Sequence, residues 1–315
     1  MSRKITIIGA GSVGATIAYS LSQDDIASEI VMIDVNRDKA EGEVMDIIQG
    51  TCFRDPIAIT AGDYEDAKDS DIVIITSGVA RKPGQSRLEL AQTNVNILKS
   101  ITPQIVATAP NAKYIIVSNP VDILTYVFTK ISGIPENQII GSGTVLDTAR
   151  LRCGIAEHFN IAQKNVHAYI FGEHGDSSFV PWSKASISSI PMDEYAALMQ
   201  ARGVDVKPID KAAMLEYVQK SGGKIIANKG ATFYAVSTAV CKLCNILLAS
   251  TESMSCVSSM MHGEYGIEDV CLSTSTLVGP NGCRGKVETK LTEEEVGLLK
   301  KSADTLKAII AQLEI

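Results

Sequence analysis

Short apolar runs alternate with helical patterns of apolar and polar residues along the first half of the chain. The runs are rich in Ile and Val and predict strands at Lys4–Ile8, Glu29–Ile33, Ile57–Thr60, Asp71–Thr76 and Lys113–Ser118. Helical spacing predicts helices near residues 13–22, 37–49, 88–108 and 121–131. Because nearly continuous apolar strands are typical of sheets covered on both faces, this order predicts an α/β fold with a doubly wound parallel sheet.

The second half is less regular but still mixes helices and strands. Its expected elements are a helix at about 145–159, a strand at Val166–Phe171, helices near 210–220 and 223–248, and two short strands around 255–274. Thr292-Glu-Glu-Glu295 has the spacing of a capping box and predicts the start of an amphipathic final helix. We expect residues 1–142 to form one domain and residues 143–315 a second, mixed α/β domain.

The composition is that of an ordinary globular protein long enough for two domains, with 315 residues of which 45% are hydrophobic. A net charge of −7 argues against a nucleic acid or an anionic membrane as partner. The apolar runs are too short to span a membrane. The two cations before the first strand do not mark a signal peptide, because a glycine loop follows after only about four apolar residues.

The seven cysteines are odd in number and scattered, which is typical of reduced thiols and favours a cytoplasmic protein. Cys241-Lys-Leu-Cys244 has the spacing of a redox motif or of half a zinc site. No second CxxC and no nearby His completes it, so we interpret both cysteines as structural and expect no metal site.

A glycine-rich loop, Gly9-Ala-Gly11-Ser-Val-Gly14, follows the first predicted strand and opens a helix. Its glycines allow a tight turn and let backbone N–H groups approach a pyrophosphate. Asp34 ends the second predicted strand, where its carboxylate would accept from ribose hydroxyls. Strand, loop, helix and acid together indicate a dinucleotide site rather than an ordinary turn. Because Val35 and Asn36 offer no cation for a 2′-phosphate, the sequence favours NAD over NADP, although Arg37 follows.

Three side chains of the second half have the chemistry of an acid–base site. Asp147-Thr-Ala-Arg150 is followed by Gly-Glu-His174-Gly-Asp176. His174 would exchange a proton, Asp147 would orient its imidazole, and Arg150 would fork onto a substrate carboxylate. A lone histidine is more often structural, but the flanking glycines and the Asp/Arg pair favour catalysis. In a chain that opens with a nucleotide loop, this set suits hydride transfer at a carbon that bears oxygen.

Two loops leave the carboxyl ends of predicted strands, where ligands of such sheets bind. The loop from Thr76 to Arg87 carries three cations among Gly, Pro and Ser, and predicts a charged flap over an anionic substrate rather than a plain surface loop. Ser118-Asn119-Pro120 ends the fifth predicted strand. Asn119 would bind a substrate oxygen or the carboxamide of a nicotinamide.

These motifs together resemble the L-lactate/malate dehydrogenase family over essentially the whole chain, and its bacterial lactate dehydrogenases most of all. The resemblance rests on Gly-Ala-Gly-Ser-Val-Gly, Ser-Asn-Pro-Val-Asp-Ile-Leu-Thr-Tyr, Gly-Ser-Gly-Thr-Val-Leu-Asp-Thr-Ala-Arg and Gly-Glu-His-Gly-Asp-Ser. It implies a Rossmann domain and the reversible, NADH-dependent reduction of pyruvate to L-lactate. His174 is then the proton donor and acceptor, Asp147 its partner, Arg150 the carboxylate clamp and Arg87 the loop arginine that polarises the carbonyl.

The resemblance implies further positions around substrate and cofactor. Substrate-binding positions are Arg81, Asn119 and Thr232. Cofactor-binding positions are Gly9, Gly11, Val13, Gly14, Asp34, Tyr64, Gly78, Asn94, Val117, Asn119 and Ser142. Arg152 and His167 match a pair that binds fructose 1,6-bisphosphate in allosteric bacterial members, and the family implies a dimer or tetramer, here a homotetramer.

Other residues favour a malate dehydrogenase. Arg81 stands where malate enzymes carry an arginine that pairs with the second carboxylate of oxaloacetate, and Gln85 replaces an acid usual in lactate enzymes. Gly222-Gly223 departs from the aromatic residue that lactate enzymes commonly carry before Lys-Gly-Ala-Thr, which concerns the pocket wall and favours neither substrate. A related 2-hydroxy acid dehydrogenase is a third interpretation. A solvated Arg81 would leave the lactate interpretation intact. A non-catalytic NAD-binding or structural protein is a further alternative, which turnover of any 2-oxo acid would exclude.

Overall fold

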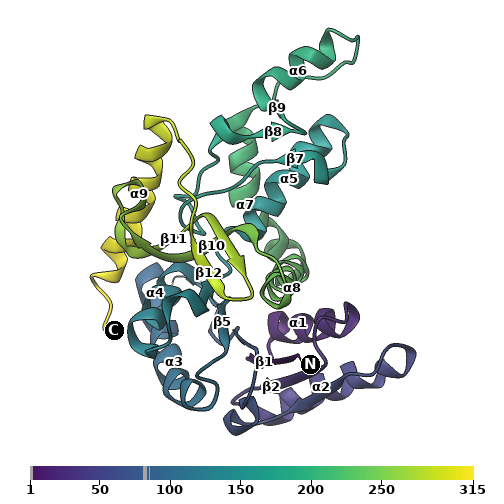
Figure 1. The fold of residues 1–315 in the computed structure, drawn as a ribbon, viewed down its shortest axis with the longest axis vertical. Helices are drawn as coiled ribbons and strands as arrows, with labels where there is room; N and C mark the ends of the chain where they lie inside the picture. Colours follow the sequence, from purple (N-terminus) through teal and green to yellow (C-terminus); the bar gives the residue numbers. More distant parts are fainter. Residues whose placement is uncertain (1–2, 81–83, 85) are drawn as a thin grey trace.

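One central sheet organises the molecule (Figure 1). The computed structural model describes residues 3–80, 84 and 86–315, and in them nine strands form this sheet in the order β12-β11-β10-β6-β5-β4-β1-β2-β3. Its parallel strands are β1 (Lys4–Ile8), β2 (Glu29–Ile33), β3 (Ala58–Ala61), β4 (Ile72–Ile75), β5 (Lys113–Ile116) and β6 (Ile139–Gly141). Their order, 3-2-1-4-5-6, is that of a Rossmann fold, so the predicted fold class is confirmed.

Helices cover both faces of the parallel strands. They are α1 (Ser12–Gln23), α2 (Arg37–Gln49), α3 (Arg87–Thr108) and α4 (Val121–Ser132). Alternate residues of β4 enter different apolar clusters, with Val73 and Ile75 in one and Ile72 and Ile74 in the other. Successive side chains of a strand point to opposite faces, so a strand buried on both faces must be apolar throughout.

The second half extends the same sheet with antiparallel strands. These are β10 (Ser253–His262), β11 (Glu268–Gly279) and β12 (Gly282–Lys286), and β10 joins β6 through the pair Ser258 and Gly141. A small sheet holds β7 (Val166–His167), β8 (Ser186–Ile187) and β9 (Ile190–Pro191). The helices are α5 (Val145–Phe159), α6 (Met192–Gln200), α7 (Lys211–Lys229), α8 (Tyr234–Leu248) and α9 (Glu293–Ile310). Because the sheet continues past residue 142, the expected domain boundary there stays a prediction.

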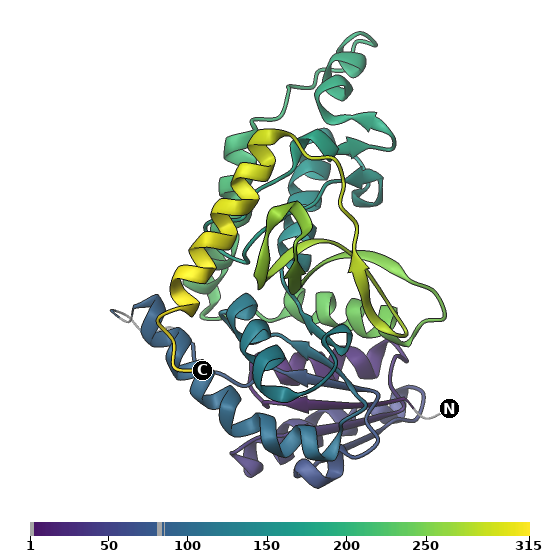
Figure 2. The same cartoon turned by 60° about the vertical axis from the view of Figure 1, so that its left-hand side comes forward.

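The chain end returns to the first half. Figure 2 shows α9, in yellow, running along the outside of the molecule toward α3. Beyond α9, the backbone N–H of Glu314 donates to Oε1 of Gln92 at 2.9 Å, and Nε2 of Gln92 donates to the Glu314 carbonyl at 3.3 Å. The predicted capping box at Thr292 and Glu295 is present at the start of α9.

Two expectations for the second half are wrong. The strand expected at Val166–Phe171 is limited to β7, after which Phe171 forms only a bridge to Phe179. The helix break expected between residues 220 and 223 lies instead at Gly230, whose φ is +86°. A helix tolerates glycine at a modest cost, whereas a positive φ ends it. The strands β6, β8, β9 and β12 and the helix α6 were not expected.

Three general features of the described residues concern membrane helices, cysteines and metal ligands. In the described part of the chain, no helix is both long and apolar enough to cross a membrane. All seven cysteines are free thiols, and Cys241 and Cys244 lie buried on α8 in the apolar cluster beneath the sheet. Residues 3–80, 84 and 86–315 bring together no group of three His, Cys, Asp or Glu side chains that could hold a metal ion.

Candidate active site

A cavity of about 410 Å³ opens where the parallel strands end. Its lining comes from both halves of the chain: Thr76 follows β4, Asn119 follows β5, Arg150 lies on α5, His174 follows β7, and Thr232 precedes α8. In open α/β sheets, ligands bind beyond the carboxyl ends of the strands, at the point where the strand order reverses. The cavity therefore lies where the sequence predicted a site.

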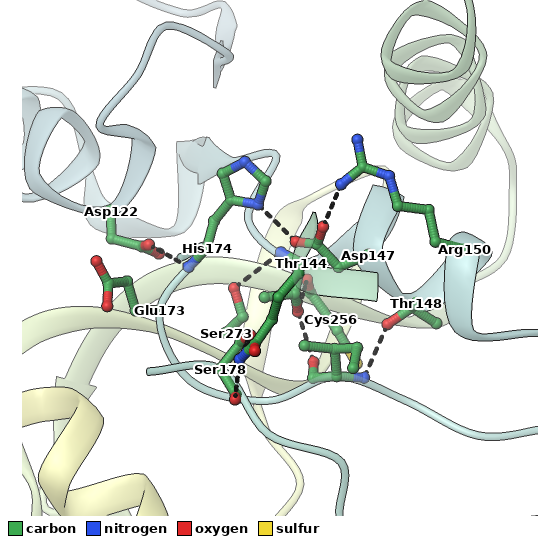
Figure 3. Close-up of polar contacts among 12 residues, drawn as sticks. Asp122, Thr144, Asp147, Thr148, Arg150, Glu173, His174, Ser178, Cys256 and Ser273 are labelled. Carbon is green, nitrogen blue, oxygen red and sulfur yellow. Dashed lines mark hydrogen bonds and ion pairs between the residues drawn. The ribbon is translucent and has the colours of Figure 1, made fainter. Parts of the chain in front are cut away.

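Three of the predicted catalytic side chains, His174, Asp147 and Arg150, are joined through Asp147. Figure 3 shows the Asp147 carboxylate between the imidazole of His174 and the guanidinium of Arg150. Oδ2 of Asp147 lies 2.5 Å from Nδ1 of His174, and Oδ1 accepts from Nη1 of Arg150 at 2.7 Å. Asp147 and Arg150 are three residues apart on α5 and so share one helix face. With Nδ1 held by the carboxylate, Nε2 is the nitrogen left to exchange a proton.

Charge rather than burial decides the pKa values of this pair. Burial alone lowers the pKa of His174, but the Asp147 carboxylate raises it by charge and hydrogen bonding, and the net pKa lies above the usual value. Burial alone raises the pKa of Asp147, but His174 and Arg150 bring it below its usual range. The pair therefore favours a charged imidazolium beside a carboxylate, as an acid that protonates a substrate requires.

Asp122 is a site residue that the sequence prediction missed. Only 2% exposed, it lies in the first turn of α4, and its Oδ2 accepts from the backbone N–H of His174 at 2.7 Å (Figure 3). Burial raises the pKa of Asp122 to about 6, against the opposing effects of nearby donors and of His174. An acid at the start of a predicted helix and set among Val121, Ile123 and Leu124 was the available signal, since a carboxylate on an apolar stretch needs a partner.

We expect Asp122→Asn to keep the hydrogen bond to the His174 backbone while removing the charge that raises the His174 pKa. Reduction needs the imidazolium, so the alkaline fall of kcat/KM should move to lower pH. Below pH 3.8 the carboxyl is neutral in both folded and unfolded chains; stability is then lost as pH rises from 3.8 to the folded pKa of about 6, and this loss is complete above it. The neutral side chain of Asp122→Asn does not ionise, so the variant should keep about 3 kcal/mol of unfolding free energy that the wild type lacks above pH 6.

The measurements are a pH profile of kcat/KM and thermal unfolding from pH 5 to 8. Asp269→Asn is the control, because this exposed carboxylate pairs with Lys130 and is not among the groups that shift the His174 pKa. An unmoved pH profile in Asp122→Asn would show that Asp122 does not act on the imidazole.

The glycine loop fits a dinucleotide. Gly9 has φ +110°, and a Cβ there would lie 2.6 Å from Oγ1 of Thr76. A Cβ at Gly14 would lie 1.9 Å from the Gly9 carbonyl oxygen, so the α1 backbone packs directly on the loop. At Gly11, the N-cap of α1, a Cβ would meet nothing within 4 Å, which leaves the helix N-terminus open to an anion.

Asp34 is tied to the same loop. Its Oδ2 accepts from the Ala10 backbone N–H at 2.6 Å and its Oδ1 from the Asn36 N–H at 2.9 Å. It lines a second cavity of about 870 Å³ that borders the glycine loop. Arg37, the cation nearest in sequence, is engaged by Glu41 at 3.0 Å and by Asp63 at 2.7 Å. Because that guanidinium is already paired with two carboxylates, the arrangement fits NAD better than NADP.

Most of the predicted cofactor positions line one of the two cavities. The cavity that contains His174 is also lined by Val13, Asn94, Val117 and Asn119. The second cavity is lined by Gly9, Gly11, Asp34 and Tyr64. Gly78 lines both. Ser142 is not among the lining residues of either. Asn94 is 2% exposed and uses its amide to bind the backbone of Val79 and Asn119, so it braces the loops after β4 and β5.

Arg87 lies at the rim of the site. It begins α3, half exposed, and pairs with Asp176. With Asn119 and His174 it lines a small cavity of about 210 Å³ beside the first. Arg81 and Gln85, on which the malate interpretation depends, lie outside the described residues.

Arg152 and His167 lie away from this cavity. The Nε of Arg152 donates to the Ala168 carbonyl at 3.1 Å, and its guanidinium lies 4.8 Å from the ring centre of Tyr169. His167 is exposed on β7. Arg152 lines a groove of about 750 Å³ between α5, α8 and β10 that also carries Lys164 and Lys242.

The whole chain is similar to known proteins. Residues 3–141 match the model of the lactate/malate dehydrogenase NAD binding domain, and residues 144–314 that of the lactate/malate dehydrogenase alpha/beta C-terminal domain. The L-lactate dehydrogenase of Acetivibrio thermocellus is 46% identical over 99% of this chain and 98% of the relative, and L-lactate dehydrogenase 1 of Clostridium acetobutylicum is 46% identical over 96% of each. The crystal structure of the minor L-lactate dehydrogenase of Enterococcus mundtii superimposes with a TM-score of 0.94 at 35% identity, covering 100% of this chain and 99% of that one.

Proposed function

Because the chain belongs to the lactate/malate dehydrogenase family, we propose that it is an L-lactate dehydrogenase with His174 as its acid and base. It is an NAD-dependent oxidoreductase that acts on the CH–OH group of a small 2-hydroxy acid and, in reverse, on the matching 2-oxo acid. The observation that carries this proposal is the contact of His174, Asp147 and Arg150 in one cavity beside the glycine loop.

Each of these side chains has one task in the reduction. Arg150 binds the substrate carboxylate with its guanidinium fork, the geometry that suits a carboxylate best. Protonated His174 donates from Nε2 to the ketone oxygen, and Asp147 stabilises the imidazolium and holds the ring in place. In the oxidation of the hydroxy acid, neutral His174 accepts the proton instead.

The residues around the reacting carbon complete the site. Arg87 polarises the substrate carbonyl, where its charge favours the developing oxyanion, and Asn119 and Thr232 form the pocket walls. NAD, held across Gly9–Gly14 and Asp34, supplies or accepts the hydride when bound. In the proposed division, residues 1–142 bind this cofactor and residues 143–315 provide most of the acid–base site.

The chain is further proposed to assemble as a cytoplasmic homotetramer. The groove between α5, α8 and β10 is apolar with the cations Arg152, Lys164 and Lys242, while α2 exposes Met45 and Ile48 among acidic residues. These two surfaces are complementary in charge and apolar character, so α2 of one copy suits the groove of another. Light scattering tests the assembly, and a monomeric mass at micromolar concentration would contradict it.

An anionic effector is the proposed regulator. Arg152 lines the groove between α5, α8 and β10, His167 lies exposed on β7, and a sugar bisphosphate such as fructose 1,6-bisphosphate offers phosphates for both. The proposal is lost if the KM for pyruvate is the same with and without this compound.

The reaction itself is tested by kcat/KM with NADH for pyruvate and for oxaloacetate, each with and without fructose 1,6-bisphosphate. We expect pyruvate to be preferred over oxaloacetate. The described cations of the cavity are Arg150, which binds the single carboxylate of pyruvate, and His174, which binds its ketone oxygen, so no described cation is left for a second carboxylate. Oxaloacetate preferred by about a hundredfold, roughly 3 kcal/mol, would instead identify a malate dehydrogenase and assign Arg81 to the second carboxylate.

A further inference from the structure

Helix α7 forms one wall of the catalytic cavity. Gln219, Gly222, Gly223 and Ile226 line it, at spacings that place them on a single face of the helix. The two central positions of this face carry no side chain. A wall that would normally present two side chains to the ligand therefore presents backbone.

Local backbone geometry does not require these glycines. Both lie inside α7, and neither is among the glycines with positive φ. Alanine stabilises a helix interior more than glycine does, since glycine loses more conformational freedom on folding. The two glycines thus weaken the helix locally, and their presence needs another reason.

Packing against the rest of the protein does not require them either. A Cβ at Gly222 would lie 3.5 Å from Nη2 and 4.0 Å from Nη1 of Arg150, which is ordinary contact, and a Cβ at Gly223 would meet nothing within 4 Å. Gly154 of α5 is the contrasting case, because its Cβ would lie 2.8 Å from Sδ of Met214. The space beside Gly222 and Gly223 belongs to the cavity.

We infer that Gly222 and Gly223 widen the cavity beside Arg150 so that the enzyme accepts 2-oxo acids with an apolar side chain larger than the methyl group of pyruvate. This inference rests on the proposed function and specifies its substrate class. Gly222 is adjacent to the guanidinium that binds the substrate carboxylate, so the added space lies beside the bound acid rather than at a remote end of the cavity.

The remaining wall favours an apolar group in that space. Ile226 and Val236 line the cavity near the glycines, and its cations in the described part of the chain are Arg150 and His174, both already used by a monocarboxylate. A second carboxylate along α7 would lack a partner, and Asp176 on the same cavity would repel it. Each extra methylene that becomes buried gains about fourfold in affinity.

The experiment compares kcat/KM for pyruvate, 2-oxobutanoate, 4-methyl-2-oxopentanoate and oxaloacetate in the wild type and in Gly222→Ala. In the wild type, both larger apolar acids should react within about tenfold of pyruvate. In Gly222→Ala, the ratio of 4-methyl-2-oxopentanoate to pyruvate should fall by about tenfold or more, since one methylene in a tight pocket is worth that much. Gly297→Ala, an exposed glycine inside α9 with open space for a Cβ, is the matched control and should leave the ratio unchanged.

The possible failures are distinct. No turnover of any 2-oxo acid would overturn the proposed function itself. This inference would be overturned, and the proposed function left standing, if kcat/KM for the larger apolar acids were more than about tenfold below that for pyruvate. An unchanged ratio in Gly222→Ala would have the same meaning. A preference for oxaloacetate over all the others would also overturn it. The wild-type comparison decides even if the variant does not fold.

Discussion

Replacing His174 by asparagine is expected to lower kcat for 2-oxo acid reduction by about 10²–10⁴-fold, the usual contribution of a positioned acid–base group. Asparagine can occupy much the same space and bind Asp147, but it cannot carry the proton that the substrate oxygen needs. The affinity for NADH should hardly change, because the cofactor is held mainly by the glycine loop and Asp34. Steady-state kinetics and a fluorescence titration with NADH measure the two effects separately.

A matched substitution tests whether the loss is specific. His158→Asn alters an exposed histidine on α5 whose ring nitrogen contacts the Lys207 carbonyl at 2.8 Å, outside the cavity. We expect it to keep wild-type turnover. If His174→Asn kept turnover within about tenfold of the wild type, proton transfer by His174 would have to be abandoned.

Replacing Arg150 by lysine should lower kcat/KM for pyruvate by about 10²–10³-fold, or about 3–4 kcal/mol. Lysine keeps the charge but offers a point donor in place of a planar fork, so it cannot bind the substrate carboxylate in two places while also donating to Asp147. Most of the loss should appear in KM, since the group binds substrate before and during the reaction.

Two controls accompany the Arg150 variant. Arg284→Lys changes an exposed arginine that pairs with Glu252, and should leave the kinetics unchanged. Thermal unfolding shows whether Arg150→Lys is folded, because Arg150 and Asp147 form a largely buried pair. An unchanged KM for pyruvate in a folded variant would remove Arg150 from the carboxylate site.

The first half of the fold was predictable in detail because its signals are local. The strands β1 and β2 have the bounds expected from their apolar runs, and α2 begins and ends where its pattern does. A parallel strand buried on both faces must be apolar throughout, and the following turn marks its end. The sequence did not predict β6, and it predicted too long a strand at β7, because distant pairing rather than local sequence sets the length of both.

The helix α7 is a second case in which tertiary packing, not local sequence, decided where an element ends. The sequence predicted a break between residues 220 and 223, yet α7 continues through Gly222 and Gly223 to Lys229. Its contact with α5, where Gly154 approaches Met214 and Tyr217, holds the helix against the local cost of the glycines. Tertiary packing therefore turned an expected loop into a wall of the cavity.

The chemistry of the site was readable from residue types alone, because proton transfer, carboxylate binding and pyrophosphate binding each need particular groups in a recognisable order. His174, Asp147, Arg150 and the glycine loop follow from that requirement. Only the folded chain decided that Asp122, 52 residues before His174, would accept a hydrogen bond from the backbone N–H of His174. It likewise decided that the His174 pKa would be raised by Asp147. Burial and charge act through space, so they depend on where distant segments meet rather than on what stands next to each residue.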